Sequence, residues 1–517
     1  MSICKLLGAV VISAATIPMA ACAPKATDKK TSLTDRDSTS ICSSLVQNAG
    51  SDTLQISSST ALTDSSELPP YCQIKGTIAP NIGFEARFPL SDWNGRYYQS
   101  GCGGYCGVIA ADKPGQSNTI NYALKRNYAT ITTDGGHQAA HIGVSEWATN
   151  NREAEEVFAH KVLPLTFEAG QSLVKSFYDA DPNYNYFSGC SNGGRLAAIA
   201  AQRYPDLFDG IIAGCPILNL SENAGLFGTN VVQSNPKVNG QRVLSASFSA
   251  KLASLEKEIL AQCDGVDGKS DGIISSPFEC RPNLEKIQTC SSETNADLCL
   301  TPAEKSTIES FYRGAVNSAG DTLFHGMPPG SERYWAFWFL DPENGDAPGN
   351  LLAGGYVQHV GLETDPIDPS KLDFNFDTGP AKLEALAPLY NALNPDLSAF
   401  RNAGGKMIMW HGMSDPLVLP HQSPKYYDDV VQTMGGLKAV QDFTRLYMAP
   451  GLGHCWELAA PTPDHMDFLT ALENWVEKDE TPEAIDVTQH YPESERVRRK
   501  GKLNPYPLQA EYGSVLP

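Results

Sequence analysis

The amino-acid sequence predicts an α/β fold in which a mostly parallel sheet is interrupted by a large insertion. Short strand patterns alternate with helical patterns between about residues 128 and 214, which is typical of a parallel sheet with flanking helices. The regularity is lost over 217–400 and resumes at 406. We therefore expect one discontinuous domain, 41–216 and 401–517, with a second domain inserted over 217–400.

Each expected element has a local signature. Strands are expected where short runs of β-branched, apolar or aromatic residues end in a turn sequence, at 128–133, 184–188, 210–214, 406–410 and 445–448. Helices are expected over 157–177 and over the Ala-rich stretch 195–203.

The overall composition excludes two broad classes of protein. With 41% hydrophobic residues in a chain of 517, a real core can form, so intrinsic disorder is excluded. The 39 Lys and Arg against 59 Asp and Glu give a net charge of −20, which repels nucleic-acid phosphates. The basic runs 29–30 and 498–500 are too short to offset this charge, so we expect no nucleic-acid partner.

The N-terminus has the pattern of an export signal. An uncharged, Ala- and Val-rich stretch covers 6–21, which is shorter than the about 20 residues of a membrane-spanning helix. It ends in Met19-Ala20-Ala21-Cys22, which resembles a lipoprotein cleavage box with Cys22 as the lipid anchor; ordinary signal cleavage nearby is the alternative. We predict a signal peptide over 1–22, a flexible linker over 23–40, and a periplasmic, outer-membrane lipoprotein or secreted location.

The pattern Gly-x-Ser-x-Gly occurs twice, and only the first copy has the expected surroundings. Gly189-Cys190-Ser191-Asn192-Gly193 follows a predicted strand and precedes a predicted helix. This is the setting of a nucleophile elbow, a tight turn that lifts a serine hydroxyl clear of the backbone and requires small neighbours. The second copy, centred on Ser270, lies in an Asp- and Gly-rich loop without a preceding strand, and we interpret it as coincidental.

A serine nucleophile needs a base, and the base needs an orienting carboxylate. In α/β-hydrolases these residues follow one another in the order Ser, acid, His. Asp415 and His454 each follow a predicted strand after the insertion, so Ser191, Asp415 and His454 are the predicted catalytic triad. His137 precedes the serine and is expected to be a loop residue, and His411 is expected to pack beneath the site.

Export places the cysteines in an oxidising compartment, where disulfides form. Two of the 13 cysteines lie in or at the signal, so 11 remain, and an odd number leaves at least one outside intrachain disulfides. If Ser191 and His454 meet, their neighbours Cys190 and Cys455 come within disulfide distance. Such a bond would tie the nucleophile to the base.

The chain resembles the tannase and feruloyl esterase family of α/β-hydrolases. The motifs that carry the resemblance span about residues 70–500: GCSNGGR (189–195), AQRYP (201–205), FDGIIAG (208–214), DLSAF (396–400), GGK (404–406), HGMSDP (411–416) and GHC (453–455). The resemblance implies an α/β-hydrolase fold with a large lid domain. It also implies an exported serine carboxylic ester hydrolase that cleaves esters of aromatic acids, of the feruloyl esterase or tannase type, through an acyl-enzyme. A related class of esterases hydrolyses mono(2-hydroxyethyl) terephthalate, and an esterase of that class is the alternative function.

The tetrahedral oxyanion of such a reaction needs two backbone N–H donors. One is expected from Asn192, the residue after the nucleophile, and the other from an early loop at a strand end. The Gly-Cys-Gly-Gly loop is the candidate, and its resemblance to the family's Gly-Gly turn favours Gly103, with Gly104 close behind. For Cys102 and Cys106 in this loop, a local bond and a bare thiol both stay open.

The loop 263–273 has three carboxylates spaced three and four residues apart, with glycines that allow it to wrap tightly. Carboxylate and carbonyl oxygens are the ligands that Ca²⁺ prefers. The loop resembles the family's calcium site in the lid. This implies a structural Ca²⁺ bound by the side chains of Asp264, Asp267 and Asp271 and by the backbone carbonyls of Lys269 and Ile273. An Asp/Gly turn held by a disulfide is the alternative.

Three further disulfides are predicted, the first of them from export, from its place at the start of the domain and from family likeness: Cys42–Cys72, Cys263–Cys280 and Cys290–Cys299. Cys215, at the end of a buried strand, is expected to remain a thiol.

The choice of substrate is expected to depend on the insertion. Its aromatic run 334–339 can stack on an aromatic acyl group or form the core of the lid. The sequence does not choose between ferulate, gallate and terephthalate. Two other functions stay open: a non-catalytic Ca²⁺-dependent binding lipoprotein on the same scaffold, against which the intact triad argues, and a serine peptidase of the same fold.

Overall fold

The computed structural model describes residues 37–112, 119–291, 296–362, 374–455, 462–463, 465–491, 494 and 496–516. The predicted signal peptide 1–22, with Cys22, and most of the predicted linker 23–40 lie outside these ranges. None of the helices within them combines the length and the apolar character that crossing a membrane requires.

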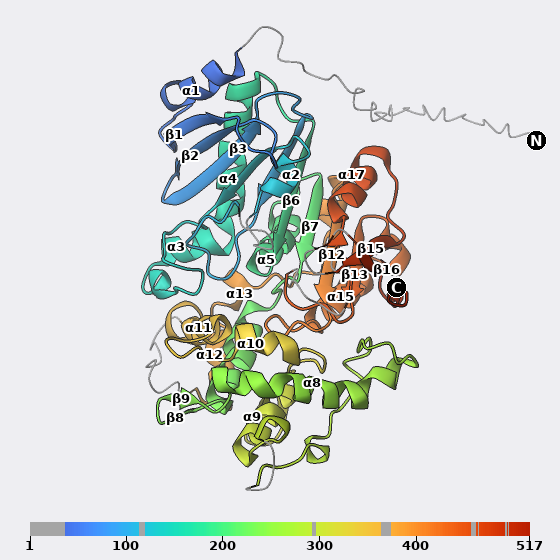
Figure 1. Ribbon diagram of the computed structural model, residues 1–517. Coiled ribbons are helices and arrows are strands. Elements are labelled where there is room, and N and C mark those ends of the chain that lie inside the picture. Colours follow the sequence, from blue (N-terminus) through green and yellow to red (C-terminus); the bar gives the residue numbers. More distant parts are fainter. Residues whose placement is uncertain are drawn as a thin grey trace, which may run out of the picture.

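A nine-stranded sheet forms the centre of the protein (Figure 1). Neighbouring strands are parallel in the order β5-β4-β6-β7-β12-β13, and β3, β2 and β1 extend the sheet beyond β5 in antiparallel pairs. The strands are β1 (Leu54–Leu62), β2 (Tyr71–Ile78), β3 (Ile82–Pro89), β4 (Arg96–Ser100), β5 (Ala129–Thr133), β6 (Tyr184–Cys190), β7 (Gly210–Gly214), β12 (Lys406–Gly412) and β13 (Thr444–Ala449). The expected strands correspond to β5, β6, β7, β12 and β13, and the predicted α/β fold is confirmed.

Alternating side chains build a hydrophobic core on each face of the sheet. In β12, Met407 and Met409 join the cluster that contains α4 and α5, while Ile408 and Trp410 join the cluster that contains α17. The helices around the sheet are α1 (Ser38–Asn48), α2 (Asn121–Leu124), α3 (Arg152–Glu156), α4 (Val162–Tyr178), α5 (Asn192–Arg203), α14 (Ser398–Asn402), α15 (Gln422–Thr433), α16 (Leu437–Gln441) and α17 (Phe468–Lys478), with short turns η1 (Glu146–Ala148) and η2 (Val157–Lys161). The helix expected over 157–177 is the π-helical turn η2 continued by α4, and the helix expected over 195–203 begins at Asn192.

The described residues of 217–400, called the lid from here on, contribute no strand to the nine-stranded sheet. The elements of the lid are α6 (Leu220–Glu222), η3 (Asn223–Gly228), α7 (Thr229–Ser234), β8 (Lys237–Val238), β9 (Gln241–Arg242), η4 (Ala246–Phe248), α8 (Ser249–Cys263), η5 (Asp264–Asp267), η6 (Leu284–Lys286), η7 (Ala296–Leu298), α9 (Pro302–Arg313), β10 (Ala315–Val316), β11 (Thr322–Phe324), η8 (Glu332–Tyr334), α10 (Trp335–Trp338), α11 (Pro348–Gly355), η9 (Tyr356–Val360), α12 (Gly379–Leu383) and α13 (Ala387–Tyr390). The lid has its own hydrophobic cluster, which also takes in Tyr105 and Val418 from loops that follow β4 and β12. It therefore packs against the carboxyl ends of the parallel strands, where ligands bind in open α/β sheets (Figure 1).

A second, antiparallel sheet closes the C-terminal end of the chain. It consists of β14 (His465–Met466), β15 (Ile485–His490), β16 (Val497–Leu503) and β17 (Glu511–Tyr512). Val487 and Leu503 pack into the same cluster as α17. This sheet was not predicted from the sequence.

Candidate active site

Ser191 lies at the sharp turn between β6 and α5. Its backbone has φ 63° and ψ −121°, a positive-φ conformation that residues with side chains rarely adopt. The neighbouring glycines make the turn possible, because a Cβ at Gly189 would lie 2.5 Å from the backbone of Gly193. The first Gly-x-Ser-x-Gly copy thus has the geometry of a nucleophile elbow, whereas Ser270 is exposed in a loop of the lid.

Asp415 and His454 meet in the loops that follow β12 and β13. Oδ2 of Asp415 lies 2.5 Å from Nδ1 of His454, and both side chains are buried. Oδ1 of Asp415 accepts hydrogen bonds from the backbone N–H groups of Leu417 and Val418, at 2.9 Å each. Burial by itself raises the pKa of Asp415, but His454 and His411 outweigh it and lower the pKa to about 2. The ionised Asp415 keeps the proton of a neutral His454 on Nδ1, so Nε2 is the basic nitrogen.

Two other histidines lie where the sequence analysis expected them. His411 is buried, with Nε2 2.9 Å from the carbonyl oxygen of Val418 and 3.4 Å from Oδ2 of Asp415. Because a carbonyl only accepts, this Nε2 carries a proton, and His411 supports Asp415 from beneath. His137 lies in the loop after β5 and stacks on Trp147, with ring centroids 4.0 Å apart. Burial lowers the pKa of His137 to about 4, so its ring is neutral at pH 7.

A disulfide links the segments that carry Ser191 and His454. Cys190–Cys455 joins the residue before Ser191 to the residue after His454, with Cα atoms 5.9 Å apart. The sulfur of Cys215 takes part in none of the five disulfides and lies within 4.8 Å of both sulfurs of this bond. The structure also contains the three other predicted disulfides and one that the sequence left open: Cys42–Cys72, Cys263–Cys280, Cys290–Cys299 and Cys102–Cys106.

Ser191 lines a cavity that is partly open to solvent. Asn192 and Gly104 line it beside Ser191, and the lid contributes Phe227 and Phe339. No Asp, Glu, Lys or Arg is among the lining residues in the described parts of the chain. Because an unpaired charge is costly to bury, the cavity suits an uncharged, apolar group.

The two predicted sources of oxyanion donors lie next to each other at this cavity. Asn192 is the first residue of α5, whose N-terminus favours negative charge. Of the two glycines considered for the second donor, Gly104 lines the cavity and Gly103 does not. The carbonyl oxygen of Gly103 accepts a hydrogen bond from the N–H of Cys106, at 2.9 Å. The role of Gly103 stays a prediction, and Gly104 is the better placed of the two.

The aromatic run 334–339 contributes to the core of the lid and also reaches the cavity, and its stacking on an acyl group stays a prediction. Trp335 is fully buried in the core of the lid. Trp338 presents its ring edge-on to His454, with centroids 5.4 Å apart, and Phe339 lines the cavity. The lid therefore contacts His454 directly.

Sequence reasoning missed a lid residue that supports the loop after Asp415. The side chain of Asn223 donates a hydrogen bond to the carbonyl oxygen of Leu417, at 2.9 Å, and accepts one from the N–H of Leu419, at 3.0 Å. These bonds hold the loop that follows Asp415. No local signal marks Asn223, because its partners lie almost 200 positions away in the sequence.

The predicted calcium loop has the expected oxygen atoms but in a different arrangement. The carboxylate of Asp264 accepts hydrogen bonds from three successive backbone N–H groups at 271–273, at 3.2 to 3.3 Å. Asp267 and Asp271 accept bonds from N–H groups two residues further on. In the described parts of the chain, the oxygen atoms of these three carboxylates do not all lie within 4.8 Å of one another. The donor chemistry fits a hard cation, and the calcium site stays a prediction.

Comparison with known proteins adds independent findings. The model of the family described as tannase and feruloyl esterase matches residues 67–515. The chain is 33% identical over 463 residues to an uncharacterized esterase of Xanthomonas campestris pv. campestris, which covers 81% of this chain and 77% of that protein. It is 31% identical over 513 residues to mono(2-hydroxyethyl) terephthalate hydrolase of Piscinibacter sakaiensis, which covers 87% of this chain and 84% of that protein. The crystal structure of feruloyl esterase B from Aspergillus oryzae is similar, with a TM-score of 0.77, 25% identity and coverage of 92% of this chain and 98% of that chain.

Proposed function

The chain belongs to the tannase and feruloyl esterase family, and we propose that it hydrolyses esters of aromatic acids with Ser191, His454 and Asp415 as its catalytic triad. The observation that carries this assignment is the junction at Cys190–Cys455. This bond brings a serine on a positive-φ turn together with a histidine whose Nδ1 lies 2.5 Å from a buried carboxylate.

The reaction follows from the protonation states of these groups. Nε2 of His454 takes the proton of Ser191 as Oγ attacks the ester carbonyl carbon, and Asp415 stabilises the resulting imidazolium. The developing oxyanion accepts hydrogen bonds from the N–H groups of Asn192 and of Gly103 or Gly104. His454 then donates its proton to the leaving alcohol, which leaves an acyl-enzyme. Water, activated by the same nitrogen, releases the acid and restores Ser191.

The acyl group is proposed to be uncharged and aromatic. The apolar cavity with Phe227 and Phe339 supports an aryl ring, and its lining carries no charged side chain in the described ranges. Ferulate and gallate esters have neutral acyl groups at pH 7. Mono(2-hydroxyethyl) terephthalate carries a carboxylate that would be costly to bury there, so it is the alternative substrate.

A structural Ca²⁺ on the loop 263–273 is part of the proposal. Its ligands would be the side chains of Asp264, Asp267 and Asp271 with the carbonyl oxygens of Lys269 and Ile273. When bound, the ion would neutralise the carboxylates of the loop, which lies in the lid and outside the lining of the catalytic cavity. The loop also contacts the C-terminal sheet, since Arg499 donates to the carbonyl oxygen of Asp271 at 3.3 Å.

Export is likewise proposed from the signal pattern over 1–22, with Cys22 as a possible lipid anchor. The five disulfides support an oxidising compartment.

A panel of substrates tests the proposed function. Methyl ferulate, methyl gallate, mono(2-hydroxyethyl) terephthalate and a peptide are incubated with the wild type, Ser191→Ala and the matched control Ser270→Ala. We expect ester hydrolysis without peptide cleavage, a loss of about 10⁴-fold or more in kcat for Ser191→Ala, and no change for Ser270→Ala. Loss of activity in Ser270→Ala alone would mean that the other serine is the nucleophile. Wild-type protein without activity on any ester would refute the proposed function.

A further inference from the structure

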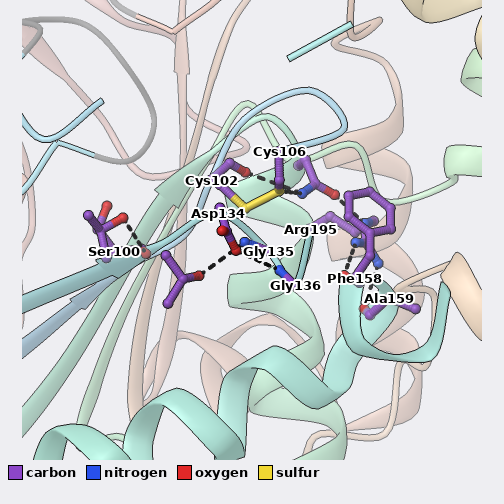
Figure 2. The surroundings of a disulfide bond; sticks show 12 residues. Ser100, Cys102, Cys106, Asp134, Gly135, Gly136, Phe158, Ala159 and Arg195 are labelled. Atoms are coloured by element: carbon purple, nitrogen blue, oxygen red, sulfur yellow. Dashed lines mark hydrogen bonds between the residues drawn. A yellow bond between two sulfur atoms is a disulfide. The ribbon is translucent and has the colours of Figure 1, made fainter. Parts of the chain in front are cut away.

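A fifth disulfide lies beside the nucleophile, in the loop that follows β4. Cys102–Cys106 spans four positions, and its two residues are only 2% and 1% exposed (Figure 2). Gly101 joins this loop to the nucleophile strand, because its N–H donates to the carbonyl oxygen of Ser188, at 2.9 Å. The bond therefore closes the same loop that supplies the second oxyanion donor.

Several amides of this loop are already engaged in backbone hydrogen bonds. Cys106 has φ 63°, and its N–H donates to the carbonyl oxygen of Gly103, while the N–H of Tyr105 donates to the carbonyl oxygen of Ile142, at 2.8 Å. In the described parts of the chain, the N–H groups of Gly103 and Gly104 donate to no backbone carbonyl. Both N–H groups lie inside the ring that the disulfide closes, and either can donate to an oxyanion.

The side chain of Asn192 joins this ring to the nucleophile elbow. Its Nδ2 lies 3.2 Å from the carbonyl oxygen of Cys102 and 3.4 Å from Sγ of Cys106. Its Oδ1 accepts from Nε of Arg195, at 2.8 Å. The fully buried Arg195 in turn donates to the backbone carbonyls of Ala159 and Phe158 (Figure 2). It also donates to the backbone carbonyl of Tyr390. Asn192 is therefore held from one side by Arg195 and holds the disulfide ring on the other.

The fold makes room for the disulfide at one particular glycine. Gly135 has φ 82°, and a Cβ there would lie 2.6 Å from Cβ and 2.8 Å from Sγ of Cys106 (Figure 2). The neighbouring Asp134 anchors the far end of the loop, because its carbonyl oxygen accepts from the N–H of Gly107, at 2.7 Å. The disulfide is thus closely packed against Gly135, and the loop that contains it is anchored at Asp134.

We propose that the Cys102–Cys106 disulfide, acting through Asn192, is a positioning element that holds both oxyanion donors in place. The inference rests on the proposed function, in which an oxyanion forms at Ser191. Two successive glycines have the most mobile backbone available. Ordering them before the reaction means that their loss of conformational entropy no longer adds to the activation free energy. Since the donors engage the charge only in the transition state, losing the disulfide lowers kcat and leaves KM almost unchanged.

The test replaces the bond in the full-length protein with Cys102→Ser/Cys106→Ser. The matched control is Cys290→Ser/Cys299→Ser, which removes another short-loop disulfide of nine positions, in the lid. Hydrolysis of a small activated aromatic ester is expected to lose at least about tenfold in kcat, toward the 10²–10³ of a missing oxyanion donor, with KM within about twofold. The control variant is expected to keep its kcat.

Inhibitor binding separates positioning from a merely structural role. An aryl boronic acid forms a tetrahedral adduct with Ser191 that places an oxygen at the oxyanion site, whereas the aromatic acid product binds as a ground state. The affinity of the boronic acid is expected to fall by the same factor as kcat, and that of the product to stay within about twofold. Unchanged kcat, or equal losses for both inhibitors, would overturn the proposal.

A second variant keeps the test decisive if the serine pair does not fold. Asn192→Ala retains the backbone donor but removes the amide that contacts Cys102 and Cys106, and it is expected to reproduce the kcat loss with KM retained. If both variants fold, the protein that combines all three replacements is expected to lose little more kcat than the variant with the larger loss. Retained kcat in Asn192→Ala, or fully additive losses, would refute the coupling. The wild-type protein is assayed in parallel. An inactive wild type would refute the proposed function, whereas an active wild type with unaffected variants would refute only the positioning role of the disulfide.

Discussion

Removal of the Cys190–Cys455 disulfide is expected to cost both stability and activity. The bond joins residues that are 265 positions apart. The chain-entropy relation gives about 5.6 kcal/mol for a closed loop of this length at 25 °C, as an upper value, because two other disulfides shorten the chain within it. Unfolding entropies of about 2.1 cal/mol/K per residue sum to about 1 kcal/mol/K for this chain, so the melting temperature should fall by about 5 °C.

The perturbation is the double replacement Cys190→Ser/Cys455→Ser. A single replacement would leave one thiol within 4.8 Å of Cys215, where a new disulfide can form. Cys290→Ser/Cys299→Ser is the control, because its bond spans nine positions and the same relation gives about 2.6 kcal/mol, or roughly half the shift. Thermal unfolding of the full-length protein, followed by circular dichroism, measures both variants.

Hydrolysis of a small aromatic ester measures the second effect of the same change. Without the bond, the loop that carries His454 loses its covalent link to the residue before Ser191, so kcat is expected to fall as well. Equal or reversed losses of stability in the two variants would refute the loop-length argument. A full stability loss with unchanged kcat would show that the disulfide does not align His454 with Ser191.

The remaining predictions concern charge and metal. Asp415→Asn is expected to lower kcat about 10⁴-fold at pH 7, because an amide stabilises the wrong tautomer of His454; steady-state kinetics measure this, and a loss below tenfold would remove Asp415 from the triad. Burial raises the pKa of Glu332 from 4.5 to about 7, so its contribution to stability is full below pH 4.5 and is lost as the pH rises through 7. Glu332→Gln should therefore flatten the pH dependence of the melting temperature over pH 5 to 8, and an unchanged profile would contradict this. Chelation of Ca²⁺, or Asp267→Asn, should lower the melting temperature and raise KM, because crowded carboxylates loosen the lid. Hydrolysis of a small activated ester should survive chelation, and its loss at an unchanged melting temperature would make the metal catalytic.

The sequence by itself determined those parts of the site that depend on neighbours along the chain. The elbow at Ser191 was predictable because its glycines, strand and helix all lie within a few positions of the serine. The strands that precede Asp415 and His454 were predictable from short apolar runs between turns. Cys190–Cys455 was predictable because each cysteine is next to a residue of the proposed triad.

Other elements left too little local signal. β1 is exposed along most of its length, because it pairs on one side only at the edge of the sheet. Its Ser- and Thr-rich sequence therefore lacks the apolar alternation by which a half-buried strand is recognised. The C-terminal sheet was missed as well, and its strands β14 and β17 are only two residues long.

The tertiary structure alone decided which distant segments meet around the triad. Trp338 contacts His454 and Asn223 holds the loop after Asp415, although neither stands in a motif that marks such a contact. From the sequence, Cys102 and Cys106 could be either bonded or free thiols. The structure shows the bond, in a loop that packs against Asn192 and Gly135. The physical reason is that backbone preferences act between residues a few positions apart. The packing of the lid on the ends of the strands depends instead on side chains brought together from the whole chain.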